Sequence, residues 1–421
     1  MRNRKKITRI FALLLAAPML LTGCSGASTA SEPEETAAVT EATTEPPTTE
    51  PPTTEAPTEP PVVLDRDMTL EEKIYQMFIV TPEALTGVGK VQSAGDSTKA
   101  ALDERHVGGL IYFGDNLRSF GQTQDMLENT QDFALSDGGL GVFLAVDEEG
   151  GTVARCGNKL GTSQLEPMEV IGGRNNPEEA VEVGQTLGRT LSVLGFNVDF
   201  APVADVNLNP ANELGDRIFS TNPEVVGNMV NGVVSGIQEN NKVAATLKHF
   251  PGLGAADGNT HEDGSVVIDR TLDQLREAEF VSFERGIEAG ADFVMVTHAK
   301  ITGVNDDLPS SLSPVVCTEL LRDELGFQGI IITDSMQMNT ISANYDAGEA
   351  AVLAIEAGAD IILMPSDFSA AVAGVQEAVE SGRISENRIN QSVKRILDEK
   401  KKLGIYERIE EETESTEEAS E

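Results

Sequence analysis

The sequence has no tryptophan among its 421 residues and only four tyrosines. This scarcity argues against a long aromatic platform of the kind that grips extended polysaccharides. Basic residues are also few, because 31 lysines and arginines face 69 aspartates and glutamates, for a formal net charge of −38. Nucleic-acid binding is excluded, since it requires a basic face for phosphate contacts. Hydrophobic residues make up 40% of the chain, which is enough for a substantial folded core.

Cysteine and histidine are scarce as well, with three and four residues. Their positions form no cluster with the spacing of a metal site, and neither a GxGxxG loop after the first strand nor a Walker loop occurs. We therefore expect no metal and no organic cofactor. Cys156 and Cys317 could form one disulfide by count, but Cys317 lies in a helical-looking segment and is expected to pack as a small apolar residue.

The N-terminus has the pattern of an export signal. Several basic residues precede an apolar run from Ile10 to Leu21, which is too short for a comfortable membrane span. The run ends on Leu21-Thr22-Gly23-Cys24, which resembles the lipobox of bacterial lipoproteins, in which the cysteine is lipidated after cleavage. The alternative is an ordinary signal peptide with an incidental cysteine. We predict a lipoprotein signal peptide over 1–23, a membrane anchor at Cys24 and an extracytoplasmic location at the bacterial cell surface.

Two segments have a composition that cannot form a core. Residues 24–61 are almost only Thr, Glu, Pro, Ser and Ala, and residues 407–421 are rich in Glu. Such stretches bury too little apolar surface to fold. We predict a disordered linker and a disordered acidic tail, which together hold 16 of the 69 acidic residues.

Between them, over 62–406, short apolar runs alternate with longer amphipathic stretches, as in parallel βα units. The candidate strands are 75–80, 107–113, 141–147, 196–203, 243–250, 291–298, 329–335 and 359–365. Eight strands with helical crossovers favour an α/β fold of the (β/α)8 TIM-like barrel type. A miscounted open sheet is the alternative.

Polar side chains gather where these strands end or in the loops that follow. They are Asp147, Arg217, Lys248, His249, His261, His298 and Asp334. Because active sites of such barrels lie at this face, we predict one here. A buried Asp with Lys, Arg and His nearby suits covalent sugar transfer. The structural alternatives are a helix cap for Asp334 and a buried hydrogen-bonded pair for Lys248 and His249.

Longer motifs extend this interpretation. KHFPGLG (248–254) with GNTH (258–261) resembles the signature of glycoside hydrolase family 3, in its β-N-acetylglucosaminidase branch. VDEEGGTVAR (146–155), FAPVADVN (200–207) and GDRIFS (215–220) resemble further segments of that family. MVTHAKI (295–301), LPSSLSP (308–314), LRDELGFQGIIITDSMQM (321–338) and AGADIILMP (357–365) continue the match in order.

The resemblance implies roles for individual residues. Asp334 would be the nucleophile, and His261 the general acid/base on a mobile loop after the fifth strand. The sugar's hydroxyl and N-acetyl groups would be bound by Asp147, Arg217, Lys248, His249, His298 and Met364. Lys248 and Arg217 would also keep the pocket electropositive and lower the pKa of Asp334.

One residue departs from the family pattern. Asn259 stands where the family has the Asp of an Asp-His dyad, and an amide cannot supply the charge that stabilises an imidazolium. Asp257, Glu262 or Asp263 on the same loop are alternative carboxylates.

The first functional hypothesis is a retaining exo-β-N-acetylglucosaminidase that acts on cell-wall fragments, muropeptides or short N-acetylated glycans. The second is a family 3 β-glycosidase or phosphorylase with another sugar preference, and the third is a glycan-binding lipoprotein impaired by Asn259.

Overall fold

The computed structural model describes residues 60–136, 139–162, 164–304 and 306–407. The predicted signal peptide, Cys24, nearly all of the linker and most of the acidic tail lie outside this part of the chain. Among the described residues, no helix is both long and apolar enough to cross a bilayer. Cys156 and Cys317 are both buried and free, so they form no disulfide with each other.

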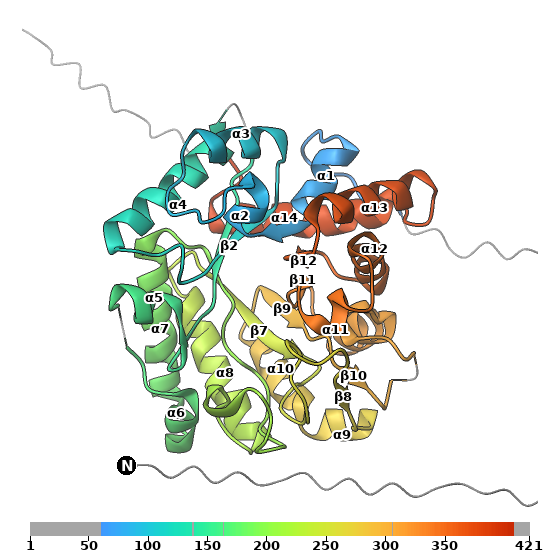
Figure 1. Ribbon diagram of the computed structural model, residues 1–421. Coiled ribbons are helices and arrows are strands. Elements are labelled where there is room, and N and C mark those ends of the chain that lie inside the picture. Colours follow the sequence, from blue (N-terminus) through green and yellow to red (C-terminus); the bar gives the residue numbers. More distant parts are fainter. Residues whose placement is uncertain (1–59, 137–138, 163, 305, 408–421) are drawn as a thin grey trace, which may run out of the picture. The chain divides into compact units, whose positions relative to one another are not determined.

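Eight parallel strands follow one another in chain order around a barrel (Figure 1), and each overlaps one of the eight predicted runs. They are β1 (Phe78–Val80), β2 (Gly109–Tyr112), β3 (Phe143–Val146), β6 (Val198–Asp199), β7 (Ala244–Phe250), β9 (Phe293–Val296), β11 (Ile330–Thr333) and β12 (Ile362–Leu363). β12 pairs with β1 in register Phe78 to Ile362. A bridge between Ile332 and Ile361 connects it to β11, which completes the ring. The predicted (β/α)8 TIM-like barrel is confirmed.

Helices surround the strands, as Figure 1 shows from the barrel end. They are α1 (Leu70–Gln76), α2 (Pro82–Thr86), α3 (Asp96–Glu104), α4 (Phe120–Ala134), α5 (Arg155–Leu160), α6 (Met168–Arg174), α7 (Pro177–Leu194), α8 (Pro223–Gln238), α9 (Leu272–Glu277), α10 (Glu279–Glu288), the π-helix η4 (Val315–Glu324), α11 (Asn339–Ser342), α12 (Ala347–Ala357), α13 (Phe368–Glu380) and α14 (Glu386–Leu403). Short 3-10 turns lie at η2 (Gly215–Arg217) and η3 (Ser310–Leu312). Two small sheets, β4 (Glu148–Gly150) with β5 (Val153–Ala154) and β8 (Val267–Ile268) with β10 (Lys300–Ile301), lie beside the barrel.

Glycines let α7 and α8 approach closely. A Cβ on Gly184 would lie 2.2 Å from the carbonyl oxygen of Val233, and one on Gly236 would lie 2.3 Å from that of Val181. Any larger residue would force the two backbones apart. The caps of α7 follow from its sequence, because Asn176 accepts from the backbone N–H of Glu178 and Gly195 ends the helix in the left-handed region.

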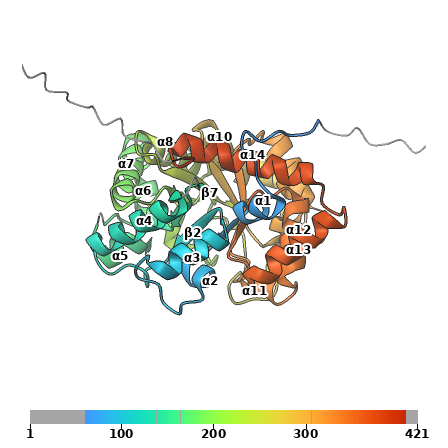
Figure 2. The same cartoon turned by 90° about the horizontal axis from the view of Figure 1, so that it is seen from above.

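The C-terminal helix α14 covers the amino ends of the strands. Its Lys400 is fully buried, donates to Gln76 Oε1 at 2.6 Å and lies 5.2 Å from the ring centre of Phe143, the first residue of β3. Just beyond the helix, the carbonyl of Ile405 accepts from the N–H of Gly141 at 2.9 Å. Figure 2 shows α14 on the opposite side of the barrel from α11, which follows the carboxyl end of β11.

The first described residues bind to this same helix. The N–H of Val62 donates to Asn387 Oδ1 at 2.7 Å, and Asp65 forms an ion pair with Lys401. The hydroxyl of Tyr406 donates to the same Asp65 at 3.2 Å. Both ends of the described chain therefore lie at the amino end of the barrel.

Barrel closure involves one buried carboxylate. Asp360, just before β12, accepts through Oδ2 from the N–H of Ile331 at 3.0 Å and from Arg322 at 2.8 Å. Its Oδ1 accepts from Ser392 at 2.6 Å and from Arg395 at 3.1 Å. One side chain thus connects the β11 and β12 edges to η4 and α14.

We predict that Asp360→Ala lowers the free energy of unfolding by about 3–5 kcal/mol, because it removes a fully buried charge and leaves its partly buried partners Arg322 and Arg395 without their counter-charge. The measurement is denaturant unfolding followed by circular dichroism. As a control, Asp398→Ala removes an exposed partner of Lys394 and should cost about 1 kcal/mol or less. Equal losses in the two variants would contradict the role of Asp360.

Candidate active site

A cavity of about 490 Å³ lies at the carboxyl end of the barrel. Residues in or directly after seven of the eight strands line it, so it is encircled rather than open along one side. Its volume is in the range of small-molecule sites. The predicted site residues that line it are Asp147, Arg217, Lys248, His249, Asn259, His261, Asp334 and Met364.

A group of buried ion pairs forms one wall of the cavity. Lys248 Nζ lies 2.9 Å from Asp147 Oδ1 and 2.6 Å from Glu149 Oε1. Arg217 binds Glu149 through two bonds, both of 2.8 Å, from Nε and Nη2. Arg155 lies further out, 3.6 Å from Asp147 Oδ2. Since Lys248 is only 2% exposed, its charge depends on these carboxylates.

The expected electropositive pocket is not what the structure contains. The charged groups of the lining are the carboxylates of Asp147, Glu149, Glu213 and Asp334 and the cations of Arg155, Arg217 and Lys248. Lys248 and Arg217 are neutralised by carboxylates that they contact directly. Burial acts to raise the pKa of Glu149, but Lys248 and Arg217 outweigh it and lower that pKa to about 2. The wall therefore offers fixed dipolar pairs to a ligand, not excess positive charge.

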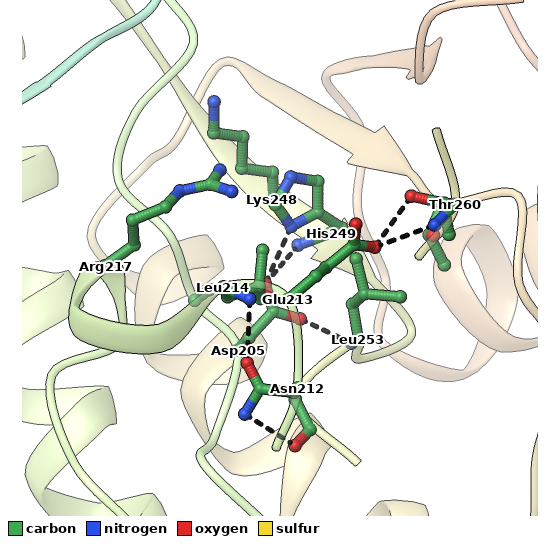
Figure 3. A network of polar contacts seen from close by, with 12 residues as sticks. Asp205, Asn212, Glu213, Leu214, Arg217, Lys248, His249, Leu253 and Thr260 are labelled. Atoms are coloured by element: carbon green, nitrogen blue, oxygen red, sulfur yellow. Dashed lines mark hydrogen bonds and ion pairs between the residues drawn. The ribbon is translucent and has the colours of Figure 1, made fainter. Parts of the chain in front are cut away.

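A second buried carboxylate orients His249. Asp205 Oδ2 accepts from the backbone N–H of His249 at 3.0 Å and lies 2.8 Å from the ring Nδ1, while Oδ1 accepts from the N–H of Leu253 at 2.5 Å (Figure 3). The contact with Nδ1 leaves Nε2 free to face the cavity. Asp205 and Asp199 are fully buried and do not line the cavity.

Asp334 directly follows β11 and lines the cavity. Its own N–H donates to the carbonyl of Val296 at 2.9 Å, and its Oδ1 accepts from the N–H of Ser335 at 2.7 Å. Burial acts to raise its pKa, but His249, the Ser335 N–H and Lys248 together hold the pKa of Asp334 below its usual value. The carboxylate is therefore ionised at neutral pH, as attack on carbon requires.

His298 lies behind this carboxylate and does not line the cavity. Its Nε2 is 3.0 Å from the carbonyl oxygen of Ser335, and its Nδ1 is 2.7 Å from Ser311 Oγ. Because a carbonyl only accepts, Nε2 carries the proton. Burial lowers the pKa of His298 although Asp334 acts to raise it. With 1% exposure and both nitrogens occupied, His298 binds the carbonyl of Ser335, next to Asp334, and is not among the residues that could meet a sugar in the cavity, as was expected of it.

The loop after β7 brings Asn259 and His261 to the lining of the cavity. Asn259 Oδ1 accepts from the backbone N–H of His261 at 2.8 Å, so the amide serves the loop backbone. Asp263 accepts from the N–H of Asn259 at 2.8 Å, while Asp257 and Glu262 do not line the cavity. The loop is fastened to α11 by Asn339 Nδ2, which donates to the carbonyl of Glu262 at 3.0 Å.

Sequence reasoning missed three charged residues of the lining. Glu149 and Arg155 lie inside the quoted segment 146–155, but neither is at a strand end. Glu213 belongs to the loop between β6 and α8, just before the segment GDRIFS (215–220), but that motif does not include it. Only the packing of loops from different strands brings these three side chains together.

The family profile described as the N-terminal domain of glycosyl hydrolase family 3 matches residues 69–398. Among the curated relatives, "Beta-hexosaminidase A" of Pseudoalteromonas piscicida is 31% identical over 324 residues, which cover 70% of this chain and 54% of that protein. "Beta-hexosaminidase LpqI" of Mycobacterium tuberculosis is 28% identical over 398 residues, or 92% of this chain and 96% of the relative. The chain thus spans about half of the first relative and nearly all of the second.

Solved structures show the same fold. A glycoside hydrolase family 3 β-N-acetylglucosaminidase from Paenibacillus sp. FPU-7 superposes with a TM-score of 0.76 at 34% sequence identity. The match covers 83% of this chain and 65% of that one.

We predict that Glu149→Gln lowers the free energy of unfolding at pH 7 by about 3–5 kcal/mol, because it leaves Lys248 and Arg217 buried without that counter-charge. Since the folded pKa is about 2 and the ordinary value is 4.5, the stabilisation is complete above about pH 4.5 and disappears as the pH falls toward 2. The difference between wild type and variant in denaturant unfolding should shrink over that range.

The matched control is Glu128→Gln on the exposed face of α4, which should change stability by no more than about 0.5 kcal/mol. A pH-independent difference for Glu149→Gln would show that its ion pairs are not the cause.

Proposed function

The chain belongs to glycosyl hydrolase family 3, and from that premise we propose that it is a retaining exo-β-N-acetylhexosaminidase. The proposal rests above all on one observation. Asp334, with its lowered pKa, and His261 line the same cavity, together with a group of charged side chains suited to sugar hydroxyls. The names of the relatives, which are β-hexosaminidases, agree with this activity.

The proposed reaction has two displacements. In the first, an Asp334 oxygen attacks the anomeric carbon, the bond from that carbon to the glycosidic oxygen breaks, and His261 gives its proton to the leaving oxygen. In the second, water attacks the same carbon, the bond to Asp334 breaks, and His261 takes the proton from the water. Two inversions at one carbon retain its configuration.

The cavity suits one terminal sugar. Residues from seven strands surround the cavity, and the barrel interior below is filled, with Phe143 and Phe293 in edge contact at 5.4 Å; this arrangement favours a glycan that enters by its end. Asp147, Lys248 and Arg217 provide charged hydrogen-bonding partners for hydroxyl groups. Met364 and other apolar side chains of the lining provide a surface for the methyl group of an acetamide.

The natural substrate and the location complete the proposal. Fragments of bacterial cell wall carry β-linked N-acetylhexosamine, and a lipid on Cys24 would hold the enzyme at the outer face of the membrane where such fragments arise. The linker of 24–61 would separate the barrel from the bilayer. The lipid anchor is inferred from the sequence motif at 21–24, and the linker is inferred from the composition of residues 24–61.

We predict that the full-length protein, solubilised in detergent, releases the aryl group from an aryl β-N-acetylglucosaminide much faster than from the matching β-glucoside. Asp334→Asn should reduce kcat by about 10³-fold or more, because it removes the nucleophile. Incubation with 5-fluoro-β-N-acetylglucosaminyl fluoride, which forms the glycosyl-enzyme faster than it hydrolyses, should label Asp334 in peptide mapping by mass spectrometry.

Asp367→Asn is the control for this substitution, since Asp367 caps α13 away from the cavity and asparagine also caps well. Faster glucoside cleavage would favour another family 3 glycosidase, and a requirement for phosphate would favour a phosphorylase. Glycan binding with no turnover of either substrate would favour a binding lipoprotein. A label on any residue other than Asp334 would refute the nucleophile assignment.

We predict that Cys24→Ser moves the protein from the membrane fraction to the soluble extracytoplasmic fraction or the medium, because the acyl chains that hold it have no attachment point. Cell fractionation with immunoblotting checks the location, and labelling with an alkyne fatty acid checks the modification. Cys156→Ser, at a buried cysteine of the barrel, is the control and should stay labelled. Equal labelling of wild type and Cys24→Ser would contradict the anchor.

A further inference from the structure

Asn259, two residues before His261 in the same loop, does not supply a charged partner for the His261 ring. Asn259 uses its Oδ1 for the backbone N–H of His261, and Asp263 is engaged by the N–H of Asn259. Within the described residues, no hydrogen bond to the imidazole of His261 is formed by this loop. An imidazole that gives and takes a proton in each cycle is nonetheless helped by a fixed carboxylate, which orients it and stabilises its charged form.

Glu213 is a carboxylate on the same side of the cavity. Its Oε1 accepts from Thr260 twice, from the hydroxyl at 2.7 Å and from the backbone N–H at 3.2 Å, and Thr260 directly precedes His261 (Figure 3). The second oxygen, Oε2, has no hydrogen bond within the described part of the chain. The side chain therefore reaches from its own loop to the residue adjoining His261.

The charge of Glu213 distinguishes it from the other carboxylates of the lining. Asp147 and Glu149 are ion-paired with bases, and Asp334 is the proposed nucleophile. Glu213 has no ion pair among the described residues, although it is partly buried and lines the cavity. A negative charge that lines the same cavity as His261 is available to an imidazolium formed there.

The loop of Glu213 is held rigidly against the loop of His261. The backbone N–H groups of Leu208 and Asn209 both donate to the carbonyl of Gly254, at 3.1 and 3.0 Å. Asn212 Nδ2 donates to the same carbonyl at 3.3 Å. A Cβ on Gly254 would lie 1.9 Å from the carbonyl oxygen of Val206, so the two loops touch at their backbones. The fold thereby holds the bases of the two loops together, and Glu213 connects them further along through Thr260.

We propose that Glu213 is the positioning carboxylate of His261 and supplies from another loop the charge that Asn259 lacks. The inference rests on the proposed function, because it concerns the acid/base of that reaction. Glu213 stays ionised throughout, while the proton moves from His261 to the leaving oxygen and returns from water. Its connection to Thr260 sets the position of the loop, and its charge stabilises the imidazolium.

The test is a cycle of Glu213→Gln, Asn259→Asp and the double variant, in the full-length protein. Glutamine keeps an oxygen for Thr260 but removes the charge. For N,N′-diacetylchitobiose, whose leaving oxygen needs a proton, we expect Glu213→Gln to lower kcat/KM by roughly 10–100-fold. For 2,4-dinitrophenyl β-N-acetylglucosaminide, whose leaving group needs none, kcat/KM should change less than about threefold. With that substrate kcat should fall, and azide should restore it with formation of the β-glycosyl azide.

Asn259→Asp in the Glu213→Gln background should raise kcat/KM for N,N′-diacetylchitobiose by at least about tenfold, because a carboxylate then stands at the dyad position of the His261 loop itself. Glu262→Gln is the control on the same loop, and its kcat/KM should match wild type for both substrates. A purely structural contact with Thr260 would leave Glu213→Gln like wild type while Glu213→Ala loses activity on both substrates equally. Either that result or the absence of rescue overturns the proposal.

Failure of the underlying function would look different. If His261→Ala shows no dependence on the leaving group, the acid/base assignment itself is wrong, and Glu213 has nothing to position. If wild type cleaves neither substrate, the proposed hydrolase activity fails before the cycle begins. The cycle therefore tests Glu213 only in a protein where Asp334→Asn and His261→Ala have already shown their expected losses.

Discussion

The candidate site depends on keeping one buried lysine charged. Lys248 lies near the carboxyl end of the longest barrel strand and is almost inaccessible to water, and an unpaired ammonium there would cost several kcal/mol. Asp147 and Glu149 remove that cost, and Glu149 in turn holds Arg217 through two bonds. Residues from three loops are thus fixed by a single charge balance. A sugar that enters meets hydrogen-bonding groups that are already oriented, so little reorganisation is needed on binding.

Hydrogen bonds between loops extend this order across the cavity. Asp205, in the loop after β6, binds both the ring of His249 and the backbone N–H of Leu253. One carboxylate therefore fixes two positions of the segment 248–254. Gly254 then receives three donors from the chain around Asn209. The acid/base loop was expected to be mobile. The base of the loop is fastened by hydrogen bonds on several sides, and only its tip near His261 is exposed, so any mobility is confined to that tip.

The sequence predicted those features that depend on the local pattern of apolar and polar residues. Strands of a parallel barrel are buried on both faces, so each appears in the sequence as an apolar run, and all eight were predicted. The positions of Lys248 and Asp334 near the ends of two of these runs then indicated that they belong to the site. Side chains placed by loop packing were not predictable in this way. Glu149 neutralises the lysine that was expected to keep the pocket electropositive, and His298 does not line the cavity, since Ser311 and Ser335 engage both nitrogens of its ring. Charge balance depends on distances that no linear spacing encodes.

The position of α14 has a practical consequence. Pro60 and Glu407, the first and last described residues, adjoin a helix that seals the pole of the barrel opposite the cavity, and Val62 and Asp65 are bonded to it. An affinity handle, a reporter or a solid support joined at residue 60 or residue 407 would lie on the side of the barrel opposite the cavity. The barrel can be immobilised from both ends while its entrance stays clear for a glycan.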